Sequence, residues 1–79
     1  MNDDERTILA FEEQHPRNDR GKEAAVRAEL GLSWVRYRQV LLQLVRRQDV
    51  LEAFPVVAHR VIRSTEAGVR ARAARTFAA

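Results

Sequence analysis

The segment from Lys22 to Leu41 constrains the fold most strongly, because a helix stop and a helix start lie within three residues of each other in it. Gly31 follows apolar residues at helical spacing, and glycine readily adopts the left-handed conformation that ends a helix. Two positions later, Ser33 can cap a new helix by accepting a hydrogen bond from a backbone N–H group. Between them, the apolar side chain of Leu32 can fill the inner side of the turn. The segment therefore predicts two helices joined by a short turn, a helix-turn-helix.

A first helix is expected over residues 2–15. Asn2 and Glu5 have the spacing of a capping box, with asparagine in place of serine or threonine. The helix should end at His15, because a residue that precedes proline avoids helical geometry. Residues 16–21 then form a polar loop rich in turn-forming residues.

Further helices are expected over residues 22–30 and 33–48, the second of them with Arg46 and Arg47 in its last turn. Asp49, together with Glu52, could cap a short fourth helix. Pro55 begins the last one, since proline is well tolerated at the first helical position.

The last helix carries an apolar stripe that weakens after Gly68. Residues 69–79 are therefore expected to leave the core as a protruding helical tail: a solvated end, an arm that contacts phosphates, or a dimer contact.

Length and composition place these helices in one domain, residues 1–79. The chain contains no cysteine, and a chain this short buries only roughly 60% of its unfolded surface. Stability must come from helix packing, and a partner chain could add to it. The expected fold class is all-α, a small helix-turn-helix bundle of four to five helices with a long basic C-terminal helix and residues 22–48 at its centre. The expected core is Ile8, Leu9, Phe11, Val26, Leu30, Leu32, Tyr37, Val40, Leu41, Leu44, Val50, Leu51, Phe54, Val57, Val61 and Ile62.

Charge is distributed unevenly along the chain. The net charge is only +3, but residues 1–13 are mainly acidic, whereas residues 31–48 and 55–79 are rich in arginine. An acidic end and a basic face suit a protein that binds a polyanion, and arginine binds phosphate and guanine edges in a bidentate way. A GC-rich genome would explain the excess of arginine over lysine, but not where the charges are placed.

The helix that begins at Ser33 is the candidate for reading DNA in the major groove. Arg38 and Gln39 lie one turn after Trp34 on the side away from the apolar positions, and such side chains bind guanine and adenine edges. Arginines of the last helix could add phosphate contacts, although a charged stripe also fits a solvated helix face. The expected DNA-contacting residues are Lys22, Ser33, Trp34, Arg36, Arg38, Gln39, Gln43, Arg60, Arg63 and Arg70.

The same face also suits a protein partner. Trp34, with Val35 and Leu42, could dock on a host transcription protein such as RNA polymerase. DNA binding would weaken steeply with salt, whereas a tryptophan-centred contact would weaken much less. A homodimer would suit a palindromic DNA site, but no heptad pattern demonstrates one.

Other function classes have little support in the sequence. The serines and the two histidines show no recognisable nucleophile–base spacing, and two histidines without cysteine make a metal site improbable. His15 and His59 are interpreted as ordinary surface residues. We expect no enzyme, no cofactor, no small-molecule substrate and no membrane partner; the acidic start and the lack of a long apolar run suggest a cytoplasmic protein.

Three stretches of the sequence form a wider pattern: residues 5–12, residues 22–33 followed by Arg36-Tyr37, and the proline-led, arginine-rich residues 55–63. Together they resemble a family of short actinobacterial proteins that also occur in actinophages and are catalogued as a domain of unknown function. The resemblance implies a small DNA-binding-like fold with no established activity. The helix-turn-helix segment more loosely resembles the promoter-reading element of sigma factors. The expected function is therefore a DNA-binding transcriptional regulator of bacterial or phage origin.

Overall fold

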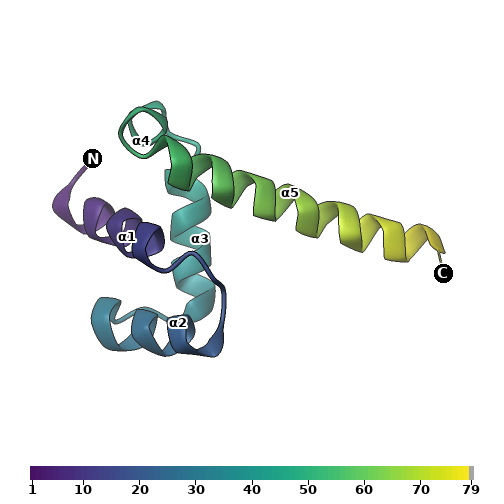
Figure 1. Cartoon of the computed structure of the whole chain (residues 1–79), viewed down its shortest axis with the longest axis horizontal. Helices are drawn as coiled ribbons and strands as arrows, with labels where there is room; N and C mark the ends of the chain where they lie inside the picture. The colour runs from purple at the N-terminus through teal and green to yellow at the C-terminus, as the bar shows by residue number, and fades with distance from the viewer. Residues whose placement is uncertain (79) are drawn as a thin grey trace.

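The fold was described with a computed structural model, which covers the backbone of residues 1–78 and the side chains of residues 1–66. These residues form helices and connecting turns without a strand (Figure 1), which confirms the all-α fold class. A single π-helical turn, η1, continues directly from α2. The elements are α1 (Asp3–Gln14), α2 (Arg20–Ala25), η1 (Val26–Leu30), α3 (Trp34–Leu44), α4 (Gln48–Ala53) and α5 (Pro55–Ala78).

Helix α1 begins and ends where its local chemistry predicts. The Asn2 side chain accepts a hydrogen bond from the Glu5 N–H at 2.8 Å, and the Glu5 carboxylate accepts one from the Asn2 N–H at 2.9 Å. This reciprocal pair confirms the capping box. At the other end, His15 is the C-cap residue and donates its backbone N–H to the Phe11 carbonyl, directly before the proline.

The turn between η1 and α3 confirms the predicted helix stop and start. Gly31 has φ 67° and ψ 22°, the left-handed conformation expected of it, and donates its N–H to the Arg27 carbonyl at 3.2 Å. The Ser33 hydroxyl accepts a hydrogen bond from the Arg36 N–H at 3.2 Å and so caps α3.

The helix before the turn differs from the prediction in its start and in its winding. It begins at Arg20 rather than at Lys22, because the Asp19 side chain accepts a hydrogen bond from the Lys22 N–H at 2.8 Å. Its last five residues wind as the π-helical turn η1, where an uninterrupted α-helix was expected.

The prediction of one helix over residues 33–48 is wrong. Helix α3 ends at Leu44, and Arg46 and Arg47 lie in the turn before α4 instead of in a last helical turn. Arg47 adopts an extended conformation at the N-cap of α4, and its guanidinium pairs with the carboxylates of Glu5 and Asp49. Asp49 therefore does not cap α4, as had been expected; it lies in the first turn of that helix, where it binds Arg47.

Helix α3 runs through the middle of the bundle (Figure 1), in contact with α1 and η1, while α5 packs on α1 and α4. Nine of the expected core residues are buried, and the others are half-buried against them. Val45 joins the core because the chain turns there. Beyond this bundle, the C-terminal half of α5 extends away from the other helices (Figure 1). The buried hydrophobic residues are Leu9, Phe11, Val26, Tyr37, Leu41, Leu44, Val45, Val50, Val57, Ala58 and Val61.

Candidate nucleic-acid interface

One side of α3 is open to solvent along the whole helix. Val35, Gln39 and Gln43 follow one another at intervals of four residues, and Arg36 lies beside them; all four are exposed. We call these four residues the α3 strip. It offers one guanidinium, two carboxamides and, in Val35, a methyl-bearing side chain that is 66% exposed. These are groups that form hydrogen bonds and apolar contacts with base edges.

Trp34 and Arg38 lie at the edge of the α3 strip rather than within it. Trp34 is half-buried, with its ring centroid 5.6 Å from that of Tyr37, so the expectation of an exposed tryptophan face is wrong. The Arg38 guanidinium carbon is 5.9 Å from the centre of the Trp34 ring, in range of a cation–π interaction. Trp34 therefore serves as a platform that holds Arg38 next to the strip.

Lys22 does not lie on the surface, where a phosphate contact would need it. Its side chain is 1% exposed, and its ammonium is 2.7 Å from the Glu12 carboxylate and 2.8 Å from the Asn18 side-chain oxygen. The predicted phosphate contact at Lys22 is therefore incompatible with this arrangement. The Lys22 side chain is held inside by Glu12 of α1 and by Asn18, which together bind its ammonium.

Glu12 is the centre of a buried polar cluster that connects four helices. Its carboxylate accepts a hydrogen bond from the Tyr37 hydroxyl at 2.6 Å and binds Lys22. Arg60 of α5 donates to the Glu12 backbone carbonyl at 2.7 Å and to its carboxylate at 3.2 Å. We call Glu12, Lys22, Tyr37 and Arg60 the Glu12 network. It fixes α3 relative to α1, α2 and α5, so it determines how the α3 strip is presented.

Sequence reasoning missed the Glu12 network, although one signal could have found it. Glu12 lies three residues after Leu9 and four after Ile8, which places its carboxylate on the apolar face of α1. A carboxylate at such a position must find partners, because an unpaired buried charge is strongly unfavourable. Tyr37 provides one of them, and burial together with the hydrogen bond to Glu12 raises its pKa well above the ordinary value. Tyr37 is therefore a neutral donor at physiological pH.

The three arginines expected to form a basic stripe on the last helix differ in their surroundings. Arg60 is bound to Glu12 and is only 30% exposed, whereas Arg63 is exposed. Arg60 and Arg38 together line a small cavity of about 60 Å³ between α3 and α5. The side chain of Arg70 lies outside the described residues. Of the two arginines of this stripe whose side chains the structure describes, Arg63 is the more exposed.

The remaining polar candidates have structural roles. His15 is half-buried: its ring stacks on that of Phe11 at 4.2 Å, and its Nδ1 lies 3.0 Å from the Phe11 carbonyl oxygen. It is therefore not the ordinary surface residue that was expected. The exposed hydroxyl of Ser33 is used to cap α3. Within the described part of the chain, no group of histidine, aspartate and glutamate side chains is placed to hold a metal ion, and no helix is long and apolar enough to cross a membrane.

Comparison with known proteins adds one finding. No curated protein and no solved structure matches the chain, so no similarity to helix-turn-helix proteins or sigma factors is shown. A family model described as "Protein of unknown function (DUF3263)" matches residues 1–75, nearly the whole sequence. The stretches of sequence that resembled a domain of unknown function lie within that match, and the chain belongs to this family.

Proposed function

We propose that this protein binds double-stranded DNA through the α3 strip and acts as a transcriptional regulator. The observation that carries the proposal is the strip itself: an exposed row of Arg36, Gln39 and Gln43 on a helix that follows a glycine turn and a serine cap. An α-helix of this kind fits the major groove, where arginine and glutamine side chains can form paired hydrogen bonds with bases.

Rigid support of α3 favours this function over a merely solvated helix face. Base readout requires side chains held in a fixed geometry by the scaffold. Tyr37, on the opposite side of α3, is anchored to the buried Glu12, and α3 is capped at its first turn. The platform of Trp34 beneath Arg38 similarly reduces the freedom of that arginine.

Phosphate contacts would come from arginines outside the strip, Arg38 at its edge and Arg63 on α5. Arg38 is half-buried against Trp34 and Arg63 is exposed, so both can reach outward. Arg60 is partly occupied by Glu12, and Lys22 is left out because it is buried. Arg70 stays a prediction from the sequence. Such contacts would position the protein without reading sequence.

A binding selection with genomic DNA fragments at near-physiological salt tests the proposal. We expect an enriched motif, and Arg36→Ala or Gln39→Ala in the α3 strip should weaken binding of that motif by about 1–3 kcal/mol. Arg6→Ala is the matched control, since it removes an exposed arginine from α1 and should leave affinity unchanged. Binding should also fall steeply as salt rises. An absence of enrichment, or equal losses for Arg6→Ala and Gln39→Ala, would overturn the proposal.

A second candidate function is docking on a protein, and one observation favours it. Val35 is an exposed apolar residue at the N-terminal end of the strip, whereas the half-buried Trp34 is a poorer anchor than expected. A bacterial or phage transcription protein such as RNA polymerase is the partner proposed. Recovery of one such protein by pull-down, in a complex that resists salt and is lost in Val35→Asp, would select this function over DNA binding.

A further inference from the structure

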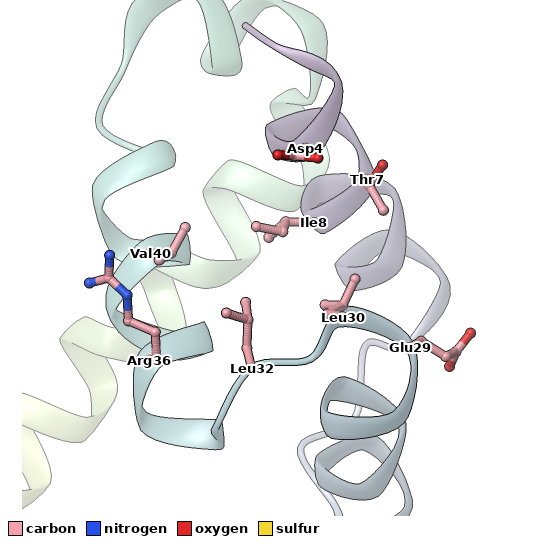
Figure 2. A pocket seen from close by; sticks show the side chains of 8 residues that line it. All are labelled: Asp4, Thr7, Ile8, Glu29, Leu30, Leu32, Arg36 and Val40. Atoms are coloured by element: carbon pink, nitrogen blue, oxygen red, sulfur yellow. The ribbon is translucent and has the colours of Figure 1, made fainter.

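A groove with an apolar floor lies on the side of the bundle formed by α1, η1 and the start of α3. One hollow in this groove has a volume of about 400 Å³ and opens between these three elements (Figure 2). Ile8, Leu30, Leu32 and Val40 turn their side chains toward it and remain half-buried rather than buried. Partial burial of four large apolar side chains leaves a surface that a further apolar element could cover.

The hollow continues along α1. A second cavity of about 360 Å³ shares Thr7, Glu29 and Leu30 with the first and extends to Gln14. The combined groove therefore follows α1 from Asp4 to Gln14, which corresponds to about 15 Å of helix length. This is the length of two to three turns of a helix laid alongside it.

The rim of this groove is mainly acidic. Asp4 on α1 and Glu29 on η1 are exposed on its two sides, and Arg36 lies at the α3 end. We call the whole depression the acidic groove. An occupant that suits it is a slender helix with small apolar residues and positive charge.

The C-terminal half of α5 has this character. Residues 67–78 are helical and extend past the bundle (Figure 1), with a length of about 18 Å. Their sequence contains three arginines, at positions 70, 72 and 75, and no acidic residue. It also contains five alanines, which permit close approach of another helix. Charge and length therefore match the groove.

We propose that the acidic groove binds residues 67–78 of α5 from a second copy of the chain. The C-terminal end of α5 and the helix α1 lie at opposite ends of the molecule (Figure 1), so a continuous α5 does not reach its own groove. Burial of the half-buried floor would supply affinity, and the opposite charges would orient the helix. This self-association goes beyond the proposed DNA binding and does not depend on it.

Engineered cysteines test the contact directly, because the natural chain contains none. Thr7→Cys places a thiol at the groove, and Ala71→Cys places one in the C-terminal half of α5. When the two purified full-length variants are mixed under mild oxidation, we expect a disulfide-linked heterodimer as the main product. Ala53→Cys on α4 is the control for random collision and should cross-link weakly with Ala71→Cys. Equal yields for Thr7→Cys and Ala53→Cys would overturn the proposal.

Sedimentation of the protein without DNA provides the second test. The triple variant Arg70→Glu, Arg72→Glu, Arg75→Glu should raise the dissociation constant of self-association by about tenfold or more. Mixing it with Asp4→Lys, Glu29→Lys should restore association, while circular dichroism reports whether each variant is folded. A natural protein that stays monomeric at high concentration, or a mixture without restored association, would refute the contact. Either result would leave the DNA-binding proposal standing, since that is measured with DNA.

Discussion

Replacing Glu12 by glutamine tests whether the Glu12 network holds the helices in place. The substitution preserves the length of the side chain, and its amide oxygen can still accept the hydrogen bond from Tyr37. Its amide nitrogen, however, is a donor and would face the Lys22 ammonium and the Arg60 guanidinium, which have only donors. The Lys22 side chain, which is 1% exposed, would then keep the hydrogen bond to the Asn18 side-chain oxygen, at 2.8 Å.

The structure indicates the size of the effect. Removing one partner of a buried ion pair costs about 3–5 kcal/mol. We expect the lower end, about 3 kcal/mol, because Asn18 remains with Lys22 and the bond from Tyr37 is retained. A domain of this length has a total stability of about 4–12 kcal/mol. The substitution would therefore remove a large share of it and lower Tm by about 12–24 °C.

Urea denaturation measured by fluorescence is the assay, because the single tryptophan, Trp34, contacts Tyr37 next to the network. Glu13→Gln on the exposed neighbour is the control and should change stability by less than about 0.5 kcal/mol. Adding Lys22→Met to Glu12→Gln should recover at least about 1 kcal/mol, since the uncompensated charge is removed. A loss below about 1 kcal/mol in Glu12→Gln, or no recovery in the double variant, would refute the reasoning.

Two further predictions concern the glycines at positions 31 and 21, and the ion pair of Asp49. Gly31→Ala should destabilise the protein by about 1–2 kcal/mol, which is the cost of placing alanine at φ 67°, because a Cβ there would meet no atom within 4 Å. Gly21→Ala in α2 should be neutral or stabilising, because the residue is helical. Equal urea midpoints for the two variants would contradict this difference. Hydrogen bonds from Arg47 lower the pKa of Asp49 to about 2, and the bond from the Asn2 N–H lowers that of Glu5. A carboxyl group whose pKa is lower in the folded state stabilises the fold at pH values above its unfolded-state pKa, which is about 4. The free energy of unfolding should therefore fall between about pH 4 and 2, and Asp49→Asn should flatten that decline in urea titrations. An unchanged dependence of the free energy of unfolding on pH in Asp49→Asn would argue against the ion pair.

Helix boundaries were predictable wherever the residues that form the cap or the turn lie close together in the sequence. The capping box of Asn2 and Glu5 and the turn from Gly31 to Ser33 involve atoms within three residues of each other, so the pattern alone located them. The apolar spacing likewise predicted Leu9, Tyr37 and most of the core.

Boundaries that depend on distant residues were not predictable. No glycine or proline marks the end of α3, and the extended Arg47 in the turn that follows is paired with Glu5, 42 positions earlier. Lys22 looked like a surface cation for the same reason, since its partner Glu12 is on another helix. The charge of a side chain follows from the residue type, but its exposure to solvent depends on which helices pack around it.

For the candidate interface, the sequence alone determined that the chain is all-α, that a helix begins after Gly31, and which polar residues that helix carries. The tertiary structure decided which of them face solvent. It half-buried Trp34, placed the Lys22 side chain inside, and left Arg36, Gln39 and Gln43 in the α3 strip. The physical reason is that helical periodicity fixes the directions of side chains relative to one another around a helix. How the whole helix is rotated about its axis is set by long-range contacts, such as the hydrogen bond from Tyr37 to Glu12.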